Sequence, residues 1–98
     1  MSGMTPEGKV KKKVKTILDL AGAYWVMPMG TGFGHAGVTD FIACYRGKFI
    51  GIECKANGNK PTALQLKHMD QIIEAGGFAY VIDETNVNEL TQILENIK

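Results

Sequence analysis

The sequence has few of the features that mark secreted or membrane proteins. No apolar run approaches the roughly 20 residues of a transmembrane helix, and residues 1–13 lack the apolar centre of a signal peptide. There are only 2 cysteines, Cys44 and Cys54, and nothing else is typical of a secreted disulfide framework. We therefore expect a cytoplasmic protein with two free thiols and no membrane partner.

The net charge is also small, at +1, but the charges are unevenly distributed. Residues 1–60 hold nine of the 11 Lys and Arg residues, whereas residues 61–98 hold six of the 10 Asp and Glu residues. Five lysines fall within seven positions: Lys9, Lys11, Lys12, Lys13 and Lys15. Such a cluster can neutralise nucleic-acid phosphates, although a solvated helix face has the same composition.

The composition, with 45% hydrophobic and 21% charged residues, is typical of one globular domain over residues 1–98. Thr5, Pro6 and Gly22 are typical of helix ends, and apolar residues recur between them at helical spacing. We predict a helix over 5–22, a strand over 23–28, a glycine-rich loop over 28–39, a hairpin over 39–46 and 48–56, a helix over 62–77, a strand over 78–83 and a helix over 86–98. This αβββαβα order predicts an α/β layer sandwich.

Three glycines in the predicted loop, Gly32, Gly34 and Gly37, spell G-x-G-x-x-G, the fingerprint of a dinucleotide-binding turn. That turn needs a helix directly after it, because the helix N-terminus holds the pyrophosphate. The residues after Gly37 predict a β-hairpin instead, so we expect no small-molecule cofactor. We interpret the glycines as allowing the backbone to approach a phosphodiester, with His35 either contacting a phosphate or solvated.

Charged residues at the predicted hairpin form the most informative pattern. Glu53 and Lys55 lie two residues apart in one strand, so they project from the same face. If the hairpin turns at Gly47, Asp40 lies beside Cys54, within one residue of Glu53. Two carboxylates and a lysine there could bind Mg²⁺ and activate water against a phosphodiester. A surface ion pair between strands has the same spacing, and the spacing alone does not separate the two interpretations.

Four short motifs occur in a fixed order: "GVTDF", "GIECK", "TALQ" and "AGGFAYVI". This ordered set resembles the VRR-Nuc branch of the PD-(D/E)XK nuclease superfamily, over roughly residues 30–83. One departure is that no proline stands directly before the aspartate of "VTD". The resemblance implies a restriction-endonuclease-like αβββαβ core, with a mixed central sheet flanked by helices and here an extra C-terminal helix.

The resemblance also assigns roles to individual residues. It implies that Asp40 and Glu53 are metal ligands, with the backbone carbonyl of Cys54 as a third ligand. Lys55 matches the catalytic lysine of the superfamily. Gln65 matches a helix glutamine that lies beside the site in this branch, and the alternative is an ordinary polar residue in the first turn of a helix.

Glu7 is a further candidate on the first predicted helix. It lies three and seven residues before Val10 and Val14, so it extends the apolar side of that helix. A carboxylate on that side is unusual without a partner. The superfamily often carries a glutamate here that points into the metal site, which makes Glu7 a candidate catalytic residue and an additional metal ligand. The alternative is a solvated carboxylate that favours the first helical turn.

These features lead to an expected function. We expect a DNA endonuclease that depends on Mg²⁺ or Mn²⁺ and cuts duplex or branched DNA, such as a four-way junction. One chain offers one metal site, so we also expect a homodimer. Lys9, Lys12 and Lys13 are expected to contact DNA phosphates. The alternative is a non-catalytic nucleic-acid-binding module that retains the nuclease fold.

Overall fold

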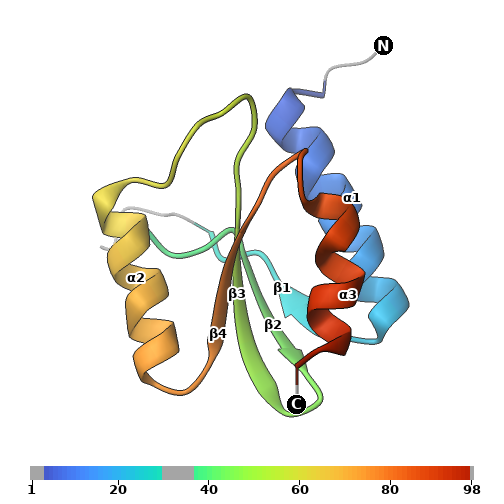
Figure 1. The fold of residues 1–98 in the computed structure, drawn as a ribbon, viewed down its shortest axis with the longest axis vertical. Helices are drawn as coiled ribbons and strands as arrows, with labels where there is room; N and C mark the ends of the chain where they lie inside the picture. The colour runs from blue at the N-terminus through green and yellow to red at the C-terminus, as the bar shows by residue number, and fades with distance from the viewer. Residues whose placement is uncertain (1–3, 30–36, 98) are drawn as a thin grey trace.

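The computed structural model describes residues 4–29 and 37–97. Its elements follow the predicted order (Figure 1): α1 (Pro6–Ala21), β1 (Tyr24–Val26), β2 (Phe41–Tyr45), β3 (Lys48–Cys54), α2 (Ala63–Glu74), β4 (Phe78–Ile82), the short 3₁₀ helix η1 (Val87–Glu89) and α3 (Leu90–Glu95). The last predicted helix is thus shorter than expected and begins as a 3₁₀ turn. Three predicted DNA contacts, Gly32, Gly34 and His35, lie outside the described residues.

Helix α1 begins and ends at the predicted residues. The Thr5 hydroxyl accepts a hydrogen bond from the backbone nitrogen of Gly8 at 3.0 Å, and Pro6 occupies the first helical position. The helix ends at Gly22, whose φ of 77° is in the left-handed region that glycine adopts without strain. The apolar side of the helix is buried through Val10, Val14 and Leu18.

The four strands form one mixed sheet in the order β1-β2-β3-β4. Strands β1, β2 and β3 are antiparallel neighbours, and β4 pairs in parallel with β3 after the crossover through α2. The β2–β3 hairpin turns through Arg46 and Gly47, with φ values of 52° and 78°. Two successive positive φ values are typical of the tight turn that matches the twist of a hairpin. The predicted mixed sheet is confirmed.

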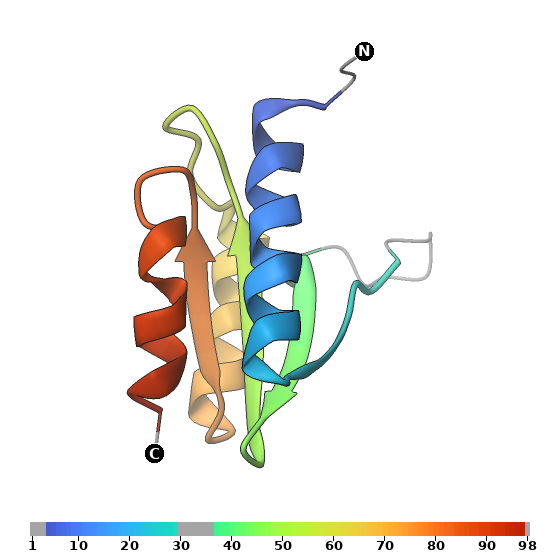
Figure 2. The same cartoon turned by 90° about the vertical axis from the view of Figure 1, so that its right-hand side faces the viewer.

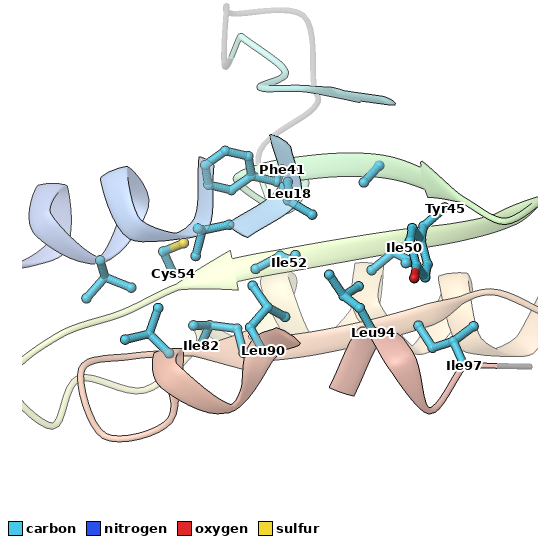
Figure 3. Packing of buried hydrophobic residues seen from close by; sticks show 14 residues of the cluster. Leu18, Phe41, Tyr45, Ile50, Ile52, Cys54, Ile82, Leu90, Leu94 and Ile97 are labelled. Carbon is cyan, nitrogen blue, oxygen red and sulfur yellow. The ribbon is translucent and has the colours of Figure 1, made fainter. Parts of the chain in front are cut away.

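The sheet lies between two layers of helix, with α1 and α3 on one face and α2 on the other (Figures 1 and 2). Figure 3 shows the main core between the sheet and the α1–α3 layer. Phe41, Ile50 and Ile52 from the strands are fully buried there, as are Leu90 and Leu94 from the last helix. Helix α3 therefore covers the sheet, as its apolar spacing predicts.

Helix α2 covers only part of the other face. It packs against β3 and β4, and a Cβ on Gly51 of β3 would lie 2.7 Å from Cδ1 of Ile72. Tyr24 and Phe49, which both align with Cys44, share that face but remain 73% and 48% exposed. The open sheet face consists of Tyr24, Val26, Ile42, Cys44 and Phe49.

Two further observations concern the helices and the cysteines. No helix in residues 4–29 or 37–97 is both long enough and apolar enough to cross a membrane. Cys44 and Cys54 are both free thiols, as predicted, with Cys44 exposed and Cys54 buried in the core.

Candidate active site

Asp40 and Glu53 come together because of the hairpin register. Phe41 pairs with Ile52, so the next positions along the two strands, Asp40 and Glu53, face one another. Oδ2 of Asp40 accepts a hydrogen bond from the backbone nitrogen of Cys54 at 2.8 Å. The hairpin thus fixes the first carboxylate beside the strand that carries the second.

Glu53 is a buried carboxylate with only one of its oxygens paired. The side chain is on the α2 face of β3, and the residue is 2% exposed. Its Oε2 lies 3.4 Å from Nζ of Lys55, whereas Oε1 is buried with no hydrogen-bond partner among the described residues. Burial and the charge of Asp40 raise the pKa of Glu53 to about 7, against the opposing effect of Lys55. A nearby positive charge would stabilise the ionised form of this carboxyl group.

Lys55 follows β3 directly and keeps the strand geometry. Its backbone nitrogen donates a hydrogen bond to the carbonyl oxygen of Ile82 at 2.9 Å, which extends the pairing with β4. Its side chain is largely buried beside Glu53. The predicted convergence of Asp40, Glu53 and Lys55 is therefore present in the structure, while their catalytic roles stay predictions.

Glu7 reaches this cluster through a lysine that sequence reasoning missed. Nζ of Lys11 lies 3.2 Å from Oε2 of Glu7 and 3.6 Å from Oδ1 of Asp40. In the sequence Lys11 is one of five clustered lysines, with no site role assigned to it. The available signal was its position four residues after Glu7, where side chains on a helix meet.

Cys54 enters the site only through its backbone. Its side chain is buried in the core, and burial, reinforced by Asp40, raises the pKa of the thiol to about 12. A thiol in that state is a poor metal ligand at neutral pH because the thiolate is the ligating form. The predicted ligand role of the Cys54 carbonyl stays a prediction.

Gln65 is engaged at the start of α2. Its Oε1 accepts from the backbone nitrogen of Thr62 at 2.9 Å, and the Thr62 hydroxyl accepts from the backbone nitrogen of Gln65 at 3.1 Å. These reciprocal bonds form a capping box. Gln65 therefore caps the start of α2, and its role beside the site stays a prediction.

The predicted phosphate-binding lysines lie away from the carboxylates. Lys9, Lys12 and Lys13 line a groove of about 750 Å³. The remaining lining comes from α1, the loop after β3, and the segment after β4: Met4, Pro6, Thr16, Ile17, Asn57, Glu84 and Asn88. Lys11 and Lys13 are two positions apart, or about 200° around the helix, so Lys13 projects from the side of α1 opposite the contact between Lys11 and Asp40.

The donor set fits a divalent cation that favours oxygen. Mg²⁺ takes one or two protein carboxylates and completes its coordination with water or substrate oxygens. Asp40 and Glu53 supply two carboxylates, and the unpartnered Oε1 of Glu53 has free capacity to accept a cation. No group of three or more His, Cys, Asp or Glu side chains in residues 4–29 and 37–97 is arranged to hold a metal. A site here would thus depend on these two side chains.

Comparison with solved structures decides the fold family. A protein described as a VRR_NUC domain matches 90% of this chain and 96% of its own, with a TM-score of 0.74 and 22% identity. The chain has the fold of a VRR_NUC domain. The resemblance predicted from the ordered motifs is confirmed, as is the restriction-endonuclease-like fold class.

Curated relatives of this VRR_NUC-fold chain are found by sequence, although no protein-family model matches it. Holliday junction resolvase RecU of Geobacillus thermodenitrificans (strain NG80-2) is 34% identical over 70 residues, which is 64% of this chain and 35% of the relative. The RecU of Streptococcus gordonii is 33% identical over 57 residues, 51% of this chain and 28% of the relative. The chain spans about a third of the length of these relatives.

Proposed function

We propose that this chain is a divalent-metal-dependent DNA endonuclease that hydrolyses phosphodiester bonds. The observation that carries the proposal is the meeting of Asp40 and Glu53, with one buried glutamate oxygen left unpartnered and Lys55 beside it. A cross-strand ion pair at the surface explains neither the burial of Glu53 nor the raised pKa of its carboxyl. The VRR_NUC fold supports the same interpretation.

In this mechanism, Asp40 and Glu53 would hold Mg²⁺ or Mn²⁺. When bound, the ion supplies Lewis-acid chemistry that offsets negative charge on the scissile phosphate. Lys55 orients the attacking water or stabilises the charge that develops on the phosphate oxygens. The contact of Lys55 with Oε2 of Glu53 keeps this ammonium group beside the carboxylates before DNA arrives. Glu7 acts indirectly, because it contacts the ammonium group of Lys11, which also contacts Asp40.

We assign branched DNA, such as a four-way junction, as the preferred substrate. The two relatives described above are named Holliday junction resolvases, and the matches cover 35% and 28% of their lengths. A junction presents two equivalent strands, which suits a homodimer with one site per protomer.

The open sheet face is the surface we assign to that homodimer. Helix α3 is occupied in covering the sheet, so its apolar residues are not available for a partner. The open sheet face instead presents Tyr24 and Phe49 on either side of the exposed Cys44. Exposed apolar patches that adjoin a sheet are typical of interaction sites.

A cleavage assay tests the function. Junction, flap, nicked and linear duplex DNA are each incubated with Mg²⁺, Mn²⁺ or EDTA. We expect cleavage with either metal and none with EDTA, and paired symmetric nicks on the junction. Asp40→Asn and Glu53→Gln should abolish cleavage while retaining DNA binding, and Asp70→Asn, an exposed carboxylate on α2, serves as the matched control. Binding without cleavage by the wild-type protein under all conditions would instead indicate a non-catalytic nucleic-acid-binding module.

A further inference from the structure

Lys11 contacts two carboxylates of the candidate site at once. It extends from α1, one turn after Glu7, and its Nζ lies 3.2 Å from Oε2 of Glu7 and 3.6 Å from Oδ1 of Asp40. The side chain is 30% exposed, so the ammonium group is partly removed from water. Burial acts to lower the pKa of Lys11, but Asp40 and Glu7 outweigh it and the pKa is raised. One ammonium group thus joins Glu7 on α1 to Asp40 on the hairpin.

The two oxygens of Asp40 are used differently. Oδ2 accepts the hydrogen bond from the backbone nitrogen of Cys54, which fixes the carboxylate on the hairpin. Oδ1 faces the Lys11 ammonium. A divalent cation held by Asp40 and Glu53 would favour the oxygen that the backbone does not use, and that oxygen is Oδ1. Lys11 and such a cation would therefore compete for one oxygen.

The charges of the cluster also indicate that Lys11 and a divalent cation would compete for Asp40. Glu7, Asp40 and Glu53 carry three negative charges when ionised, against the two positive charges of Lys11 and Lys55. Without Lys11, the metal-free site would hold three carboxylates and one ammonium group. With both Lys11 and a divalent cation on Asp40, two cations would lie side by side, which is unfavourable.

We propose that Lys11 is a placeholder cation: its ammonium group neutralises Asp40 and Glu7 in the metal-free protein and leaves Oδ1 of Asp40 when a divalent ion binds. This role rests on the proposed function only in requiring that Asp40 holds the metal. It assigns to α1 a control over metal affinity, because every binding event must break one ion pair. If Lys11 instead only positioned Asp40, removal of Lys11 would misplace that carboxylate and weaken metal binding.

Calorimetric titration of the DNA-free protein with Mn²⁺ separates the two roles. Under the placeholder role, Lys11→Met should bind Mn²⁺ about fivefold more tightly than wild type, the change expected from one partly exposed ion pair of roughly 1 kcal/mol. Lys11→Arg retains the cation and should bind close to the wild-type affinity. Lys15→Met removes an exposed lysine one turn further along α1 and is the matched control, with no expected change. Thermal unfolding should show Lys11→Met less stable than wild type in EDTA, with the difference abolished in saturating Mn²⁺.

The outcomes distinguish a failure of this inference from a failure of the metal site. If Asp40→Asn abolishes Mn²⁺ binding but Lys11→Met binds no more tightly than wild type, the placeholder role is wrong and the metal site stands. If Mn²⁺ binding is absent in both wild type and Lys11→Met, or is unchanged by Asp40→Asn, the metal site and the placeholder role are both wrong. Should Lys11→Met fail to fold, Lys11→Gln, which retains a polar side chain without the charge, replaces it under the same criteria.

Discussion

Oδ2 of Asp40 accepts a hydrogen bond from the backbone nitrogen of Cys54 at 2.8 Å, across the β2–β3 hairpin. The bond joins the residue just before β2 to the residue just after Glu53, so the two carboxylates are held by adjoining backbone and not by flexible loops. A site supported in this way keeps its geometry while its electrostatics change.

Glu53 should make the metal-free protein less stable as pH rises. Its pKa in the fold is raised to about 7 from 4.5, so between these values the folded state binds a proton that the unfolded state has released. The free energy of unfolding should therefore fall as pH rises from 4.5 to 7, by at most about 3 kcal/mol. Glu53→Gln cannot ionise and should be more stable than wild type at pH 8 but equal to it at pH 4.5. Denaturant unfolding in EDTA measures the difference, with the exposed Glu95→Gln as control. A constant difference across this range would show that Glu53 is not the titrating group.

Gln65 should prove to act in the site as well as in the cap. Glutamate at the same helix position can form a capping box, so Gln65→Glu should leave the unfolding temperature within a few degrees of wild type. It also adds a negative charge beside the carboxylates if the side chain reaches them, and cleavage should fall by at least about tenfold. Parallel measurement of unfolding and cleavage distinguishes the roles. Full cleavage by a stable Gln65→Glu protein would leave Gln65 with its capping role alone.

The groove lysines should bind DNA phosphates independently of DNA sequence. Joint replacement of Lys9, Lys12 and Lys13 by glutamine should weaken binding to all DNAs alike. The slope of log K against log salt should become shallower by roughly one for each lysine–phosphate pair that the substitutions remove. Binding is measured in the Asp40→Asn background in EDTA so that no cleavage occurs. Lys48→Gln with Lys67→Gln, two lysines outside the groove, should leave the slope nearly unchanged, and an unchanged slope in the triple variant would make its lysines a solvated helix face.

The open sheet face should carry the homodimer contact. Light scattering at micromolar concentration should give about twice the 10.7 kDa of one chain for the wild-type protein. Phe49→Lys should shift the mass to one chain, because two buried charges would face one another across a two-fold interface. Leu66→Lys on α2 is a matched control, since Leu66 and Phe49 are both 48% exposed. A wild-type mass near that of one chain would rule out a stable dimer, and dissociation by both variants would exclude this face as the specific contact.

The sequence predicted the parts of this structure that depend on local pattern. Thr5 and Gly22 bound α1 because capping is decided by neighbouring residues. The alternation of side chains along β3 placed Glu53 and Lys55 together. A turn at Gly47 predicted Asp40 opposite Cys54, whereas the two-residue turn through Arg46 and Gly47 places it opposite Glu53.

Other parts depend on how elements pack, which one sequence does not specify. The contact of Lys11 with Asp40 requires the position of α1 across the sheet, and that position follows from the packing of Val10, Val14 and Leu18 on the core. The exposure of Tyr24 depends on how far α2 extends over the sheet. The short α3 begins only after a 3₁₀ turn, and neither Asn86 nor Glu89 makes a side-chain cap hydrogen bond there.

The two-residue turn at Arg46 and Gly47 sets which side of the hairpin each later residue occupies. The strands pair from Tyr45 and Lys48 outward, and side chains alternate at every step to the residues that face Asp40. One residue inserted after Gly47 without a compensating bulge would place Ile52 where Glu53 now lies and direct the glutamate into the α1–α3 core. The candidate chemistry at one end of the hairpin is therefore as sensitive to chain length at the other end as to the identity of its own side chains.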